Sequence, residues 1–300
     1  MAADPAKLPS RERHKLWVLK SHSLSALGQW EKTLAALDSA AQASGIDAEE
    51  RACLAMHKGY LMGSLARYTE CWSLLHQAEQ AARELGLRTL VGEALWRRGM
   101  ISIFAGDYAS AATHLQSAFK IALAERNRQL EGVATAGLAK NLMYCREYVK
   151  ALARFEEALA IFEELDYPFY VAITQGELGT CYLNLGETKK ALQLLESTAE
   201  IFLAKGSLSN YQVSLADIGS VYLRRGEFLT AISYYQRALE LPRKLGDQVS
   251  ISKWLRNLSQ AYSLLGNPTL ACGFESEAES INILLTKERE RAAKVASSLQ

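Results

Sequence analysis

The sequence is short of several residues and patterns that would place it in other protein classes. Only five of its 300 residues are proline, so long uninterrupted helices are permitted. Its five cysteines are an odd number without close pairs, which argues against a disulfide framework and favours a reducing compartment. No apolar run approaches the roughly 18 residues of a membrane span, and the N-terminus lacks the apolar core of a signal peptide. We therefore predict a cytoplasmic protein.

Charge imbalance and catalytic motifs are absent as well. The chain has 34 basic and 33 acidic residues, so its net charge of +1 calls for neither nucleic acid nor a membrane surface as a partner. It contains no G-x-x-x-x-G-K-[ST] loop, no H-E-x-x-H, no C-x-x-C and no G-x-S-x-G elbow. We expect no enzymatic activity, no cofactor and no metal site, although a cysteine–histidine dyad assembled in space stays open.

What the sequence does contain is an internal repeat with a period of 40. Ala111 is followed at that interval by Ala151, Ala191, Ala231 and Ala271. Small residues recur twelve positions before these alanines, and tyrosines recur nine positions before the last three. These residues are Gly99, Ala139, Gly179, Gly219, Ser259, Tyr182, Tyr222 and Tyr262.

Each repeat unit is predicted to be a pair of helices joined by a tight turn. Glycine, asparagine or aspartate stands between the units, as at Gly86, Asn127 and Asp166, where it can stop one helix or cap the next. Asp47 with Glu50 three residues later matches a capping box. Runs of alternating β-branched residues, which would indicate strands, are missing.

The small residues in phase predict where paired helices cross closely. Gly179 on the first helix and Ala191 on the second would form such a contact, with Leu195 filling space beside it. One helix pair cannot bury its apolar faces alone, so neighbouring pairs must stack. The expected fold is an all-α solenoid with a concave and a convex face.

This phasing resembles that of the tetratricopeptide repeat family, here in a long form with a period of 40 instead of the usual 34. Gly179, Tyr182, Ala191 and Thr198 and the equivalent residues of the next unit carry the match. The resemblance implies a right-handed superhelix of about seven helix-turn-helix units. The expected parts are a tail at 1–10, an array at 11–286 with units 11–46, 47–86, 87–127, 128–166, 167–206, 207–246 and 247–286, and a capping extension at 287–300.

In this family the first helix of each pair lines the inner groove, which implies a set of candidate binding residues. The set is aromatic and methionine-rich in the middle and basic toward the C-terminus, which suits a peptide or protein segment with apolar anchors and an acidic group. Packing against the next unit is the alternative for apolar residues near helix ends, such as Phe104. The candidates are Tyr60, Trp96, Met100, Phe104, Lys140, Met143, Tyr144, Asn184, Arg224, Lys253 and Arg256.

The leading hypothesis is a non-catalytic scaffold that binds a protein or peptide ligand in this groove, with its oligomeric state left open. Residues 252–278 also resemble repeat arrays associated with bacterial CHAT proteases, and the repeats equally resemble those of peptide-sensing bacterial regulators. The alternative is therefore a sensor module, responsive to a peptide or small molecule, that controls a separate effector such as a protease or transcriptional regulator. Arg98 stands where other units carry apolar residues, and this departure favours the third unit as the place of the binding site.

Overall fold

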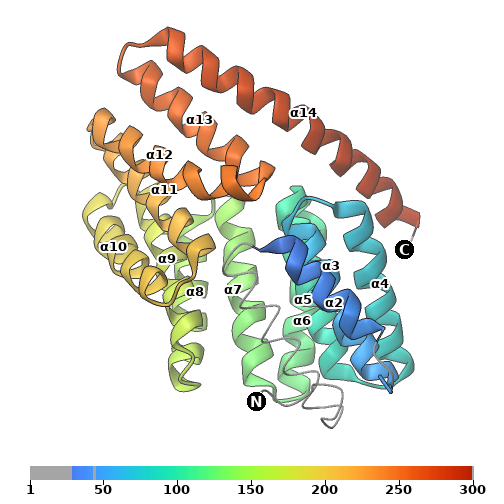
Figure 1. Ribbon diagram of the computed structural model, residues 1–300. Helices are drawn as coiled ribbons and strands as arrows, with labels where there is room; N and C mark the ends of the chain where they lie inside the picture. Colours follow the sequence, from blue (N-terminus) through green and yellow to red (C-terminus); the bar gives the residue numbers. More distant parts are fainter. Residues whose placement is uncertain (1–28, 43–44, 299–300) are drawn as a thin grey trace, which may run out of the picture. The chain divides into compact units, whose positions relative to one another are not determined.

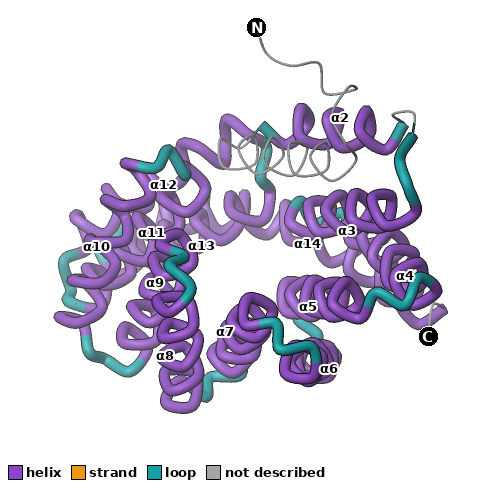
Figure 2. The backbone as a smooth tube through the Cα atoms, turned by 90° about the horizontal axis from the view of Figure 1, so that it is seen from below, coloured by secondary structure: helices purple, strands orange, loops and turns teal. Residues whose placement is uncertain are grey.

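The computed structural model describes residues 29–42 and 45–298, and every regular element in these ranges is an α-helix (Figure 1; Figure 2). This confirms the all-α prediction. The expected tail at 1–10 and the first helix of the expected unit 11–46 lie outside the described residues. The helices are α2 (Trp30–Ala41), α3 (Ala48–Ser64), α4 (Tyr68–Glu84), α5 (Arg88–Ala105), α6 (Tyr108–Ala124), α7 (Arg128–Tyr144), α8 (Tyr148–Glu164), α9 (Pro168–Asn184), α10 (Thr188–Ala204), α11 (Leu208–Arg224), α12 (Phe228–Leu245), α13 (Gln248–Leu264) and α14 (Pro268–Ser298).

Helix starts follow the sequence period. From α3 onward, the first helices of the pairs begin at positions 48, 88, 128, 168, 208 and 248, and each second helix begins 20 residues after its first helix. Most of these helices have 17 residues, and residues 48–298 form six consecutive helical hairpins. The seven-unit division of the chain stays a prediction, because the start of the expected first unit is not described.

The turns between helices share one backbone device. From residue 66 to residue 266, one residue in every twenty has a positive φ, and it is glycine in seven of these eleven turns. After α4, the Leu87 N–H donates to the Ala82 carbonyl at 2.9 Å and the Gly86 N–H donates to the Arg83 carbonyl at 3.1 Å. This pair of bonds is a Schellman motif, which satisfies the last carbonyls of a helix through a left-handed residue.

The predicted helix starts are confirmed where a side chain marks them. The Glu50 N–H donates to Asp47 Oδ1 at 2.8 Å and the Asp47 N–H donates to Glu50 Oε2 at 3.1 Å, which completes the capping box. Asn127 Oδ1 accepts a hydrogen bond of 2.9 Å from the Leu130 N–H, so it caps the helix that follows. Pro168 occupies the first turn of α9, as its missing N–H permits.

Small residues hold the paired helices together, as predicted. A Cβ added to Gly179 would lie 2.9 Å from Leu195 Cγ and 3.4 Å from the Ala191 carbonyl oxygen. In α5, a Cβ on Gly99 would come within 2.5 Å of Leu115 Cγ. Because real Cβ atoms do not approach carbon this closely, a larger residue at Gly99 or Gly179 would have to displace the facing leucine.

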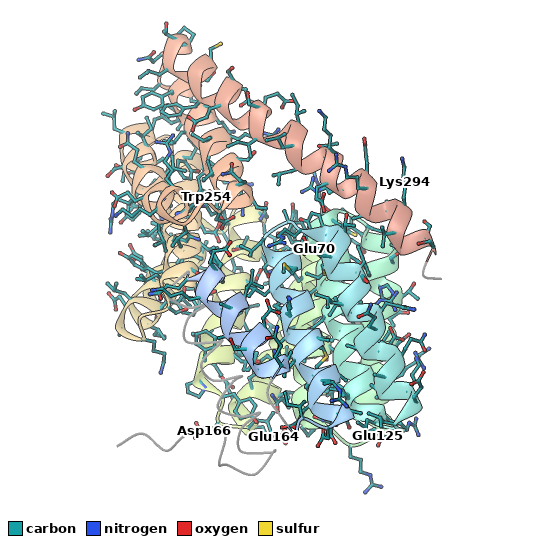
Figure 3. All side chains as sticks on the ribbon, turned by 45° about the vertical axis from the view of Figure 1, so that its right-hand side comes forward. Glu70, Glu125, Glu164, Asp166, Trp254 and Lys294 are labelled. Atoms are coloured by element: carbon teal, nitrogen blue, oxygen red, sulfur yellow. The ribbon has the colours of Figure 1, made fainter. Side chains whose placement is uncertain are left out.

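The chain divides into two compact units, the first comprising residues 1–138 and 288–300 and the second residues 139–287. Each has a buried core of its own. Leu115 is fully buried in the first, and Trp254, which Figure 3 labels, is 1% exposed in the second. Residues 287–298 of the expected extension continue the last helix, since α14 runs through Ser298. No helix in the described ranges is both long and apolar enough to cross a membrane.

Candidate functional site

In the first compact unit, two predicted binding residues stack on each other. The ring centroids of Tyr60 on α3 and Trp96 on α5 are 5.9 Å apart with an interplanar angle of 23°. The Arg97 guanidinium lies 5.1 Å from the Trp96 ring centroid and 5.9 Å from that of Tyr60. We call Tyr60, Trp96 and Arg97 the aromatic patch. Both residues are half-buried, so part of each side chain stays exposed.

Met100 does not belong to this surface, and the expectation that it lines an open groove is wrong. It is 8% exposed and lies in a core with Ile103 and Leu115. Gly137 lets α7 approach this core closely, since a Cβ there would lie 2.6 Å from Leu115 Cδ2. Phe104 is half-buried and packs against the same core, in agreement with the packing alternative.

In the second compact unit, polar side chains link the first helices of successive pairs. Lys140 on α7 forms an ion pair with Glu177 on α9, and Thr180 Oγ1 on α9 donates to Asp217 Oδ2 on α11 at 3.1 Å. Both links join residues 37 positions apart, so each reaches about one helical turn back on the next repeat. We call this row, with Lys253 on α13, the polar ladder.

The charges of the polar ladder act on Asp217. Burial raises the pKa of its carboxyl above the ordinary value, and Glu177 adds to this shift. The positive charges of Lys253 and Lys140 and the hydrogen bond from Thr180 oppose it. The ladder is therefore a charge-compensated polar face.

Other candidates also lie in the second compact unit. Asn184 is half-buried and donates from Nδ2 to the Thr180 carbonyl at 2.8 Å. Tyr144 is 42% exposed, whereas Met143 packs against the core around Phe155. Arg224 is exposed at the end of α11.

The expected basic end of the groove is largely compensated. Arg256 Nη2 lies 3.3 Å from Glu279 Oε2 on α14, and Arg256 Nε lies 3.8 Å from Glu275 Oε1. Lys253 is exposed with its Nζ 4.5 Å from the Trp254 ring centroid, and its charge opposes the raised pKa of Asp217. The prediction of an unpaired positive charge at Arg256 is therefore corrected, because α14 places carboxylates beside the guanidinium.

With this geometry in place, the chain can be compared with known proteins. A family model described as "Tetratricopeptide repeat" matches residues 132–204 and 211–281. These two segments are tetratricopeptide repeats. They cover the helix pairs whose first helices carry the polar ladder, so the ladder lies on the face formed by the first helices of these tetratricopeptide repeats.

Curated relatives match part of this chain. Response regulator aspartate phosphatase I of Bacillus subtilis (strain 168) is 31% identical over 108 residues, which cover 31% of this chain and 26% of the relative. Response regulator aspartate phosphatase J of the same strain is 24% identical over 154 residues, covering 50% of this chain and 39% of the relative. The chain thus matches well under two thirds of the length of these relatives.

Solved structures share the fold over a longer stretch. A Rap protein complexed with Competence and Sporulation Factor has a TM-score of 0.60 at 12% identity, covering 96% of this chain and 100% of that chain. NprR in complex with its cognate peptide NprX has a TM-score of 0.66 at 15% identity, covering 92% of this chain and 82% of that chain. At these identities the likeness shows the tetratricopeptide fold alone.

Arg98, which the sequence singled out, is part of a buried ion-pair network and does not face a partner. Its side chain is 12% exposed and pairs with Glu79 on α4, whose side chain is 6% exposed. Glu79 Oε1 also accepts hydrogen bonds from Arg83 Nε at 3.0 Å and Nη2 at 2.7 Å. Burial alone would raise the pKa of Glu79, but the hydrogen bonds from both arginines outweigh burial and lower it.

Three of the five cysteine thiols are poorly suited to nucleophilic chemistry. Burial raises the pKa of Cys53, Cys71 and Cys181 to about 12, so all three are protonated near neutral pH. In the part of the chain that the structure describes, no three histidine, cysteine, aspartate or glutamate side chains form a group that could hold a metal ion.

The sequence reasoning missed three side chains that shape these surfaces. Arg97 belongs to the aromatic patch, and Glu177 and Asp217 form the centre of the polar ladder. A search for polar or oppositely charged pairs 37 positions apart would have found the ladder, because that spacing is one repeat less about one helical turn.

Proposed function

We propose that the chain is a non-catalytic scaffold whose tetratricopeptide repeats bind a peptide or protein segment on the face formed by the first helix of each pair. The polar ladder is the observation that carries this proposal. Lys140 and Glu177 keep 21% and 19% of their side chains exposed, so the row can still be reached by a ligand. An extended segment presents unpaired backbone N–H and C=O groups, which a row of polar side chains can pair.

The relatives support a peptide as the ligand class. The solved structures named above hold Competence and Sporulation Factor in one case and a cognate peptide in the other. We infer that this chain also takes a short peptide or a segment of a protein, in the cytoplasm, and that nucleic acid and membranes are not its partners. Its net charge of +1 fits that assignment.

A second candidate function is a regulatory sensor, and the curated relatives favour it. Both are named response regulator aspartate phosphatases, and this chain matches about a quarter and two fifths of their lengths. In this version of the proposal, the bound peptide shifts the array between arrangements that differ in affinity for a separate effector. Peptide binding is common to both versions, so it is the property to test first.

A peptide pool tests the proposal directly. The full chain is incubated with random peptides of five to eight residues, and bound peptides are recovered and identified by mass spectrometry. A recovered peptide is then titrated into Glu177→Gln and Asn184→Ala variants and into a Gln193→Ala control, which alters an exposed residue on the second helix α10.

The ladder assignment predicts that the first two variants weaken binding by about tenfold each, as expected for a lost hydrogen bond to a charged or buried partner. The control should bind as the parent does. Equal affinity in all four proteins, or a loss confined to Gln193→Ala, would remove the first-helix face from the account. Circular dichroism establishes that each variant is folded.

A further inference from the structure

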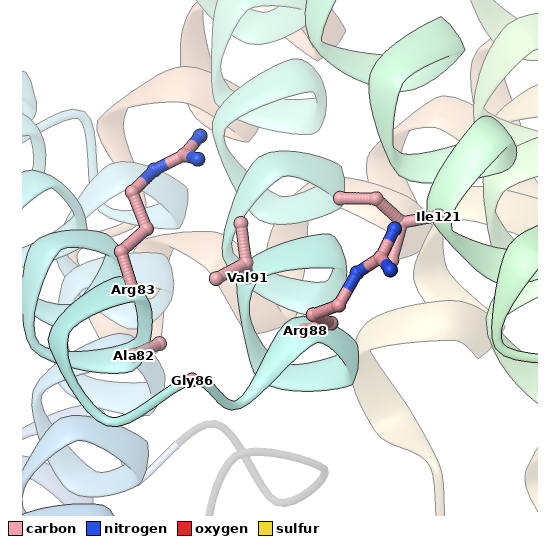
Figure 4. A pocket seen from close by; sticks show the side chains of 6 residues that line it. All are labelled: Ala82, Arg83, Gly86, Arg88, Val91 and Ile121. Carbon is pink, nitrogen blue, oxygen red and sulfur yellow. The ribbon is translucent and has the colours of Figure 1, made fainter.

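A concave feature lies in the first compact unit, and its lining residues belong to neither the polar ladder nor the aromatic patch. It is a cleft of about 330 Å³ between the end of α4, the turn after it, the start of α5 and the neighbouring α6. Figure 4 shows Val91 between the two arginine side chains at its rim. The lining residues are Ala82, Arg83, Gly86, Arg88, Val91 and Ile121.

The floor of this cleft is apolar and closely packed underneath. Ala82 is fully buried and Val91 is 5% exposed, while Ile121 is half-buried. Beneath it α5 and α6 meet at Gly92, where an added Cβ would lie 3.0 Å from Ile121 Cγ2. At the mouth nothing lies within 4 Å of a Cβ built on Gly86, so the cleft opens to solvent there.

The rim of the cleft carries two oriented guanidinium groups. Arg83 is held through Nε and Nη2 by Glu79, and its Nη1 makes no hydrogen bond to any residue in the described ranges. Arg88 approaches Glu125 Oε1 through Nε at 3.1 Å. The side chains of Arg83 and Arg88 are 52% and 66% exposed, so both can be reached by a ligand.

The charges around the cleft do not cancel. Glu79 is shared between Arg83 and Arg98, whereas Arg88 has Glu125 as its partner. These five ion-paired groups therefore keep one positive charge in excess. Because Glu79 is buried and holds Arg83 in place, part of the entropy cost of ordering that guanidinium is already met before a ligand arrives.

We propose that this cleft binds a small organic anion with a compact apolar body. The carboxylate or phosphate group would pair with the exposed edges of Arg83 and Arg88, whose planar forks match both anions. The apolar body would rest on Val91 and Ile121. The volume falls at the lower end of the range for small-molecule sites, and an apolar floor with a few placed polar groups is typical of them. This site shares no residue with the polar ladder or the aromatic patch.

Four probes distinguish the contributions of the anionic group and of the apolar ring to binding, and distinguish a carboxylate from a phosphate. Phenylacetate and phenyl phosphate carry both an anion and a ring, benzyl alcohol has only the ring, and inorganic phosphate has only the anion. Each is titrated into the full chain labelled at isoleucine δ1-methyl groups and followed by NMR. The Ile121 methyl reports the cleft, and Ile283, 48% exposed on α14, serves as the reference.

The expected result is a saturable shift of the Ile121 methyl resonance with at least one of the two phenyl anions and none at Ile283. Benzyl alcohol and inorganic phosphate should bind at least about tenfold more weakly, since each lacks half of the recognition. Saturation by phenylacetate alone identifies a carboxylate ligand, and saturation by phenyl phosphate alone identifies a phosphorylated one. No response at Ile121 to any probe, or equal affinity for benzyl alcohol, would overturn the proposal.

Variants then test the arginines themselves. Arg83→Gln and Arg88→Gln should each weaken binding of the phenyl anion by about tenfold, because each removes one guanidinium group. Arg88→Gln leaves the Glu79 network intact, so its result stands even where Arg83→Gln disturbs α4. The matched control is Arg154→Gln, an exposed arginine paired with Glu157 in the second compact unit. Unchanged affinity in both rim variants, or an equal loss in the control, would refute the site.

Discussion

The buried ion pair between Glu79 and Arg98 should couple α4 to α5, and its removal should destabilise them in a specific pattern. Glu79→Leu leaves Arg98 without its acceptor at a site where 12% of the side chain is exposed. Breaking a buried pair from one side costs about 3–5 kcal/mol. Arg98→Leu is milder, at about 1–2 kcal/mol, because Glu79 keeps its hydrogen bonds to Arg83.

The double variant Glu79→Leu/Arg98→Leu decides whether the pair or the individual charges matter. It replaces the ion pair by apolar side chains. The later repeats already carry apolar residues at the position of Arg98, namely Leu138, Leu178 and Ile218. We expect it to lie within about 1 kcal/mol of the parent protein, which with the single-variant costs above gives a coupling energy of about 3–8 kcal/mol in a double-mutant cycle.

Hydrogen–deuterium exchange of the amides in α4 and α5 measures these differences locally, as changes in the free energy of opening. The control is Glu157→Leu, which breaks an exposed pair with Arg154 and should cost less than about 1 kcal/mol. A cost for Glu79→Leu no larger than that of the control would refute the reasoning. So would a double variant as unstable as the sum of the two single variants.

Three further outcomes follow from the structure. Gly99→Ala should destabilise the protein by about 1–3 kcal/mol in urea unfolding, because its Cβ would lie 2.5 Å from Leu115 Cγ. Gly273→Ala, whose Cβ would have nothing within 4 Å, should stabilise the protein by up to about 1 kcal/mol. A change in the free energy of unfolding with the same sign for both variants would contradict the packing. Burial, aided by a nearby arginine, lowers the pKa of His114 from 6.5 to about 4, so the unfolded chain binds the proton first and stability falls as pH drops from about 6.5 to 4. His114→Phe should remove about 1–2 kcal/mol of that loss, seen as a smaller drop in melting temperature between pH 7 and pH 4.5, and an unchanged drop would exclude this histidine as the source. Trp96→Ala should leave helicity intact and weaken a selected peptide by tenfold or more if the aromatic patch contributes to binding, and parental affinity would confine the site to the ladder.

The fold could be predicted from the sequence because its determinants are local and repeated. A tight helix crossing tolerates only small residues, so Gly179 and Ala191 mark one wherever the phase returns. The cap at Asp47 and the proline at the start of α9 follow from hydrogen-bond rules that act within a few residues. Because the same local pattern recurs in successive units, it predicts a stack of helix pairs although each single occurrence is a weak signal.

The candidate surface could not be predicted to the same degree, because it depends on how each repeat is offset from the next. Met100 is buried by α7, a helix of the following repeat whose approach depends on Gly137. Arg256 looked like part of a basic end until α14 placed Glu279 beside it. These outcomes depend on contacts between repeats, whereas the period alone fixes only what happens inside one repeat.

The central claim is that the first helices of the repeats form the face that binds a peptide. Hydrogen–deuterium exchange of the full chain, with and without a saturating selected peptide, tests it most directly. The account predicts slower exchange concentrated in α9, α11 and α13, whose side chains Glu177, Asp217 and Lys253 belong to the polar ladder. Protection concentrated in the second helices α10 and α12, with the first helices unchanged, would contradict it.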